Sequence, residues 1–195
     1  IVKTVGGVVY PKHPFAASPK ELMALKGYGK DMKAARAEAK KLLKEAGASG
    51  LSVNFNNRAV DQPYKVVGTW MVDQWKKIGV KTKQRVQPSP QFYATLRKKK
   101  DFDVSIDFNC QSVVNPIADI TKFLGSAGNN YGQYQDKDLE AIYDKILRSP
   151  DKEATKALIR KYEKRALSDQ AHLLVTLWWY KINPYRSYVK GWKTS

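Results

Sequence analysis

Two stretches of the chain, residues 51–55 and 102–108, alternate between apolar and polar residues. A period of two is typical of strands that bury one face. The alternation at 102–108 is unbroken, and its apolar face begins with Phe102 and ends with Phe108. A further strand is expected at residues 80–86, between a glycine that ends a helix and two prolines, Pro88 and Pro90. We therefore expect three strands in this part of the chain.

Apolar residues at helical spacing lie before the first of these strands and between the strands. The first helix is expected to begin after Asp31, whose side chain can cap it, and to end at Gly47. The second is expected from Pro63 to Gly79, with Trp70 on its apolar, core-facing side. A short helix precedes the third strand. This α-β-α-β-α-β order predicts an α/β fold class with an open layer of mainly parallel strands.

The second half of the chain has a different pattern, which predicts three helices and one late strand. The helices are expected at residues 117–124, 139–147 and 151–166, and the strand, with both faces buried, at 173–180. Residues 1–30 are rich in Gly and Pro and predict an irregular segment.

Length and composition allow one sizeable core. The chain has 195 residues, of which 43% are hydrophobic, so we expect one or at most two domains. No apolar run approaches the ~18 residues of a membrane span. The first residue is Ile1 and not Met, so the chain is expected to be a processed product, a fragment or part of something longer.

The net charge is +17, from 35 basic and 18 acidic residues. Such a balance raises the alternative of a basic nucleic-acid-binding module. However, the basic residues are spread along nearly every helix, and the one dense run, residues 97–100, lies at an expected helix end, where cations suit the helix dipole. The pattern favours solubility over a dedicated nucleic-acid site.

Residues suited to catalysis or metal binding are scarce. The chain has a single cysteine, and neither His13 nor His172 lies near a second histidine or a cysteine. No zinc site or catalytic triad stands out. The sequence therefore predicts a protein that is not an enzyme and needs no metal or cofactor.

Uncharged polar residues follow the strand at 102–108. Ligands of α/β proteins bind beyond the carboxyl ends of strands, so this turn is expected to form one wall of a binding pocket. An ordinary polar turn is the alternative. The residues are Asn109, Cys110, Gln111 and Ser112.

Two further groups of residues are candidate ligand contacts. Asn56, Asn57 and Arg58 end the first strand, where they form either a pocket wall or a simple turn. Trp178 and Tyr180 share one side of the late strand, where they either stack on a ligand or belong to the core.

The order of several local motifs is similar to that of a known family. The motifs are the run from Lys40 to Gly47, Trp75-Lys76-Lys77-Ile78-Gly79-Val80, Phe102-Asp103-Val104, Asn130-Tyr131 before an amphipathic helix, and Val189-Lys190-Gly191 after the late strand. Together they resemble the C-terminal part of the extracellular solute-binding proteins of peptide, oligopeptide and nickel ABC transporters. The resemblance covers roughly residues 28–193.

This resemblance implies a periplasmic-binding-protein type 2-like lobe, with a mixed sheet flanked by helices. It divides the chain into a hinge-proximal segment (1–30), the second lobe (31–172) and a strand and tail returning toward a missing first lobe (173–195). The implied partners are a peptide-like or other small extended solute, an ABC transporter permease and the N-terminal lobe of the same protein. The implied location is the periplasm or the outer side of a membrane.

Three positions depart from the pattern of peptide binders. Ser112 lies where an Asp commonly pairs with the α-ammonium of a peptide, and a neutral hydroxyl cannot supply a charge-assisted hydrogen bond. Ser89 and Asn109 lie where aromatic residues are often found, which makes Ser89 a further candidate contact. These departures leave room for a sugar-containing, opine-like or otherwise modified solute.

Overall fold

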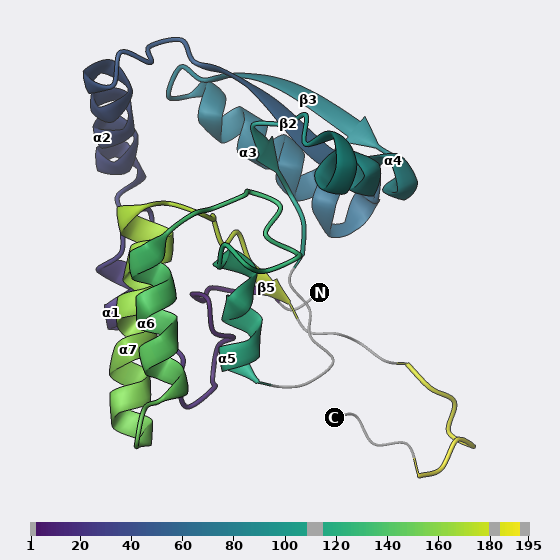
Figure 1. The fold of residues 1–195 in the computed structure, drawn as a ribbon. Helices are drawn as coiled ribbons and strands as arrows, with labels where there is room; N and C mark the ends of the chain where they lie inside the picture. The colour runs from purple at the N-terminus through teal and green to yellow at the C-terminus, as the bar shows by residue number, and fades with distance from the viewer. Residues whose placement is uncertain (1–2, 109–114, 180–183, 192–195) are drawn as a thin grey trace. The chain divides into compact units, whose positions relative to one another are not determined.

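A computed structural model describes residues 3–108, 115–179 and 184–191. The chain forms two compact units (Figure 1). One consists of residues 27–109, and the other combines residues 1–26 with residues 110–195.

The unit of residues 27–109 is built on a parallel sheet. Its strands are β2 (Ser52–Arg58), β3 (Lys81–Gln87) and β4 (Val104–Ser105), in the order β3-β2-β4. Figure 1 shows β2 and β3 side by side. The predicted α/β class, with a parallel sheet flanked by helices, is confirmed.

Helices flank this sheet on both faces. They are η1 (Asp61–Lys65), α3 (Val66–Lys76), α4 (Ser89–Ala94) and its continuation η2 (Thr95–Lys99). A further helix, α2 (Met32–Glu45), contacts α3, where Arg36 Nη2 donates to Gln74 Oε1 at 2.8 Å. The carboxylate of Asp31 accepts hydrogen bonds from the first turn of α2, as predicted.

Helix α3 covers the face of the sheet that carries Phe55 and Asn57. The rings of Phe55 and Trp75 meet edge to face at 5.5 Å. A side chain at Gly68 would place its Cβ 1.7 Å from Asn57 Oδ1, so this close approach of helix and strand requires glycine. On the other face, the Thr95 hydroxyl at the start of η2 donates to Gln87 Oε1 at 3.1 Å.

The structure corrects three predictions for this unit. β2 continues through Arg58, because Asn56, Asn57 and Arg58 pair in register with β3 and do not form a turn. The strand predicted at 102–108 is reduced to Val104–Ser105, since only these two residues pair with β2. Trp70 was expected in the core but is 56% exposed, because the sheet-facing side of α3 is the one that carries Met71 and Gly68.

The second unit contains short strands at both ends of its sequence. β1 (Lys3–Thr4) and β5 (Trp178–Trp179) pair in antiparallel register. The strand predicted at 173–180 is wrong for residues 173–177, which form no strand, and Leu174 is 60% exposed. The rest of the prediction, Tyr180, lies outside the described residues.

Helices make up most of the second unit. They are α1 (Pro19–Met23), α5 (Pro116–Asp119), η3 (Ile120–Phe123), α6 (Lys137–Leu147), α7 (Lys152–Lys164) and η4 (Arg165–Asp169). The helices α6 and α7 lie side by side (Figure 1). Leu139, Ile159 and Tyr162 are fully buried on these two helices. The Tyr162 hydroxyl donates to Ile120 O at 2.7 Å, which ties η3 to this core.

Candidate functional site

The strands of the parallel sheet all end at the same edge. Arg58 and Gln87, the last residues of β2 and β3, are in register. The chain leaves β4 toward Asp107, and α4 begins at Ser89, two residues after β3. This carboxyl edge is where ligands of open α/β sheets bind, because side chains from several loops converge there.

Arg58 lies at the centre of this edge. Its Nε donates a hydrogen bond of 2.8 Å to Ser89 Oγ. The carbon of its guanidinium lies 5.3 Å from the centre of the Tyr64 ring and 5.4 Å from that of Tyr93, within the range of a cation–π contact. Three neighbours from η1 and α4 therefore fix the direction of one cation.

Tyr93 links Arg58 to further charged groups. The guanidinium of Arg97, one helical turn further along, lies 5.1 Å from the centre of the Tyr93 ring. The Tyr93 hydroxyl lies 3.5 Å from Asp107 Oδ1, at the far end of hydrogen-bond range. The edge thus carries two arginines and one carboxylate around a phenol.

Tyr64 closes the edge on the side of η1. Its side chain is buried, and its ring meets that of Phe108 edge to face at 6.4 Å. Burial raises the pKa of Tyr64 to about 12; the negative charge of Asp107 adds to this rise and Arg58 opposes it. The phenol therefore stays neutral at physiological pH and remains a hydrogen-bond donor.

This arrangement suits the binding of an anionic or strongly polar group. Ser89 accepts from the Nε of Arg58, and Tyr64 is hydrogen-bonded to the same guanidinium. A guanidinium has five N–H donors in a planar fork, a geometry that suits a carboxylate or phosphate as a further partner. The Tyr64 and Tyr93 rings provide apolar walls, and Asp107 provides an acceptor nearby. No step of covalent chemistry is suggested by these groups.

The structure brings two of the predicted site residues together and separates others. Arg58 and Ser89 are hydrogen-bonded partners. Asn57 points to the opposite face, where its Oδ1 accepts from Gln84 Nε2 at 3.3 Å. Asn56 shares the face of Arg58 but is fully buried. Whether these residues contact a ligand stays a prediction.

The remaining candidates belong to the other unit or lie outside the description. The indole Nε1 of Trp178 donates to Gly7 O at 3.0 Å, and its ring meets that of Tyr10 edge to face. Trp178 thus packs on the N-terminal segment of its own unit. Asn109, Cys110, Gln111, Ser112 and Tyr180 lie outside the described residues.

Three members of this edge, Tyr64, Tyr93 and Asp107, were not among the site residues predicted from the sequence. Tyr93 follows Ser89 by four residues, so both lie on one side of α4. Asp107 is on the polar side of the predicted third strand, the side that carries Asp103. Tyr64 and Tyr93 each follow the last residue of a strand by six positions, and Asp107 follows β4 by two, so the signal that all three share is a place shortly after a strand end.

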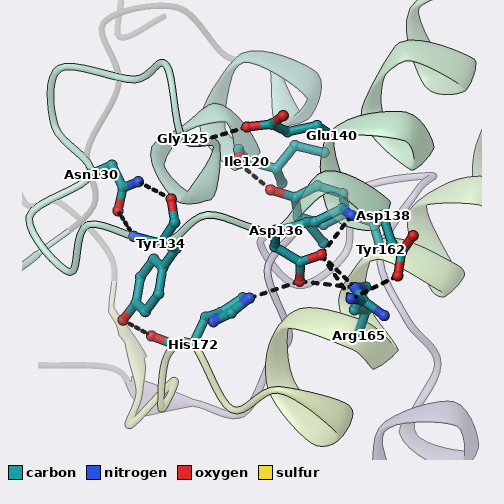
Figure 2. A network of polar contacts seen from close by, with 11 residues as sticks. Ile120, Gly125, Asn130, Tyr134, Asp136, Asp138, Glu140, Tyr162, Arg165 and His172 are labelled. Atoms are coloured by element: carbon teal, nitrogen blue, oxygen red, sulfur yellow. Dashed lines mark hydrogen bonds and ion pairs between the residues drawn. The ribbon is translucent and has the colours of Figure 1, made fainter.

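A second polar cluster lies in the other unit and has a structural role (Figure 2). Asp136 accepts from Arg165 Nε and from the backbone N–H of Leu139, and its Oδ2 lies 2.9 Å from His172 Nε2. Burial alone would raise the pKa of Asp136, but the hydrogen bonds from Arg165 and His172 outweigh it and hold the pKa well below its ordinary value. The carboxylate is fully engaged by its own chain.

Neither a metal site nor a membrane span was found in the part of the chain that the structure describes. These residues include no group of three or more His, Cys, Asp or Glu side chains placed to hold a metal ion. None of their helices combines the length and the apolar character that a membrane crossing requires.

Residues 1–131, about two thirds of the chain, match the family described as bacterial extracellular solute-binding proteins, family 5 Middle. No curated protein sequence matches significantly.

Several solved structures share the fold. The substrate-binding domain of an oligopeptide ABC transporter from Bacillus anthracis is 22% identical, with a TM-score of 0.64 over 87% of this chain and 33% of its own. OppA from Haemophilus influenzae, in complex with RPPGFSPFR, is 21% identical, with a TM-score of 0.69 over 84% of this chain and 32% of its own. NikA from Staphylococcus aureus, in complex with Ni(L-His)2, is 12% identical, with a TM-score of 0.57 over 67% of this chain and 29% of its own. The chain thus spans about a third of the length of these proteins.

Proposed function

Because the chain belongs to the bacterial extracellular solute-binding proteins of family 5, we propose that it forms the ligand-contacting lobe of a receptor that serves an ABC importer. The observation that carries this proposal is the carboxyl edge of the sheet. There, Arg58 is oriented by Ser89 and enclosed by two tyrosine rings. A cation held in this way is suited to bind the acidic group of a solute.

The solute in this proposal is peptide-like or another small, extended molecule with an anionic group. Similar proteins are described as oligopeptide-transport components or contain RPPGFSPFR, which supports a peptide-like solute. Ser112 lies where peptide binders of this family commonly have an Asp, which favours a solute without a free α-ammonium. In both cases Arg58 would bind the acid and the tyrosines would contact the adjoining apolar part.

The proposed mechanism is closure over the solute without chemical conversion. The ligand would bridge this lobe, residues 31–172, and an N-terminal lobe outside the chain, and would stabilise the closed state by its higher affinity for that state. Residues 1–30 would lie near the hinge, and residues 173–195 would lead back toward the first lobe. The closed receptor would then be presented to the permease in the periplasm or on the outer side of a membrane.

Replacing Arg58 by alanine should weaken solute binding about 10- to 100-fold, because a charged hydrogen-bonding partner contributes roughly 1.5–3 kcal/mol. The solute can be weighed by native mass spectrometry of the whole protein purified without added ligand, and its affinity for the variant then measured by calorimetry. Lys83→Ala is the matched control, since it also removes one positive charge from the sheet. Lys83 is an exposed residue of β3 on the same face as Arg58, but it pairs with Asn54, away from the carboxyl edge. Equal affinity in both variants would exclude Arg58 from the site.

The alternative function, a nucleic-acid-binding module, finds no support in the family match or in the fold. We expect no binding to duplex or single-stranded DNA at ~0.15 M salt, the physiological level. A fluorescence titration at several salt concentrations tests this. Binding that weakens steeply with salt, as counterion release requires, would favour the alternative. It would also explain the net charge of +17 as a surface for nucleic acid.

A further inference from the structure

One face of the parallel sheet is polar across all three strands. On this face, Asn56 of β2 is in register with Arg85 of β3 on one side and with Ser105 of β4 on the other. The next pair of residues on this face, Arg58 and Gln87, lies at the carboxyl edge of the sheet. Asn56 therefore lies directly behind the candidate site.

Asn56 is covered although it is polar. Helix α4 packs against β2, and Phe92 and Leu96 of α4 and η2 are buried. Asn56 has no exposed surface, and neither its Nδ2 nor its Oδ1 has a hydrogen-bond partner among the described residues. A buried carboxamide without a partner is rare in folded proteins, because it loses its hydrogen bonds to water without replacement.

Arg85, which is in register with Asn56 on the neighbouring strand, carries a second buried polar group without a partner. Its Nη1 lies 2.8 Å from Asp101 Oδ2, in the segment between η2 and β4. The buried group is the Nε of Arg85, which has no partner among the described residues.

We propose that the Asn56 carboxamide and the Nε–H of Arg85 jointly bind an ordered water molecule between β2 and the α4–η2 segment. A water molecule accepts from the arginine nitrogen and donates to the amide oxygen, so it satisfies both groups at once. A halide would accept from the donors but would leave the amide oxygen without a partner. This site goes beyond the proposed function and does not depend on it.

The first test is a double-mutant cycle in the whole protein, with Asn56→Leu, Arg85→Met and the combination. Asn56→Leu should lower the melting temperature by roughly 4 °C or more, because the substitution removes the carboxamide that binds the water. The two substitutions should be coupled by about tenfold in the unfolding equilibrium constant, since each removes the same bridge. The control Asn54→Leu, an exposed position on the same face of β2, should change the melting temperature by much less.

The outcomes separate the proposal from its rivals. An Asn56→Leu variant that melts at or above the wild-type temperature would mean that the carboxamide has no partner to lose, and would overturn the proposal. Additive effects of the two substitutions would overturn the bridge even if both variants melt earlier.

A high-resolution crystal structure of the unmodified protein gives an independent test. We expect a density peak within hydrogen-bond distance of both Arg85 Nε and the Asn56 carboxamide. A direct contact between the two side chains would contradict the water site. So would an anomalous peak at that place after a bromide soak, because it would identify an anion.

Discussion

Replacing Gly7 by alanine should lower the free energy of unfolding by about 3 kcal/mol, the cost of disturbing a buried hydrogen-bonded charge. A Cβ at this position would lie 1.7 Å from Glu163 Oε1. That oxygen accepts from the backbone N–H of Val8 at 2.8 Å, and Oε2 of the same carboxylate forms an ion pair with Arg160 Nη1 at 2.9 Å. The carboxylate cannot keep both partners and avoid the methyl group.

The position of Glu163 explains why this effect is large. Its side chain is 2% exposed, and burial raises its pKa, which shows that the site disfavours a charge without partners. The hydrogen bond from the Val8 N–H to this carboxylate also joins the N-terminal segment to α7, because Glu163 belongs to α7. The next residue, Val9, is buried. Moving the carboxylate would therefore loosen the whole segment, not only one turn.

Chemical denaturation and thermal melting measure the effect, with an expected drop in melting temperature of roughly 6–12 °C. The matched control is Gly128→Ala in the same unit, where an added Cβ meets no atom within 4 Å. It should change the free energy of unfolding by less than about 0.5 kcal/mol. A Gly7→Ala variant as stable as the control would mean that Glu163 does not lie against this backbone.

Replacing Asp136 by alanine should cost about 2 to 3 kcal/mol of stability, because it removes a helix cap and leaves Arg165 without its buried partner. Asp138→Ala offers a matched control. Both carboxylates pair with Arg165 Nη2, at 2.8 Å and 3.0 Å, but the side chain of Asp136 is 6% exposed and that of Asp138 is 77% exposed. Loss of the exposed partner should change stability by less than about 1 kcal/mol.

The same carboxylate predicts how stability depends on pH. Its pKa in the folded protein is lowered, so in acid the unfolded chain binds a proton before the folded one does. The stabilisation by Asp136 is therefore fully present above the ordinary aspartate pKa of about 4 and is lost as the pH falls below it. Denaturation curves between about pH 6 and pH 2 should show the difference between wild type and Asp136→Ala shrinking toward acid. A difference that is constant over this range would contradict the assigned pKa shift.

Sequence alone determined the elements whose signals are local. The carboxylate of Asp31 caps α2, that of Asp151 caps α7, and the spacing of apolar residues sets the length of both helices. The limits of β3 likewise follow local signals, since the strand lies between Gly79 and Pro88. Such signals can be read without knowing what each element packs against. The expectation that Arg58 and Ser89 lie near a site came from their positions at the ends of predicted strands and from the family resemblance.

Tertiary structure decided which residues meet and which are covered. Sequence periodicity placed Trp70 in the core, but the sheet packs against the other side of α3. It also predicted seven strand residues at 102–108, of which only two find a partner strand. Tyr64 and Tyr93 enclose Arg58 because η1 and α4 lie at the same edge of the sheet. Tyr64 is close to Arg58 in sequence, but Tyr93 is distant and meets it only through the fold. Asn56 was expected in a pocket wall or a turn and is instead buried within β2, since the burial of a polar residue depends on the helix above it and not on its neighbours in the chain.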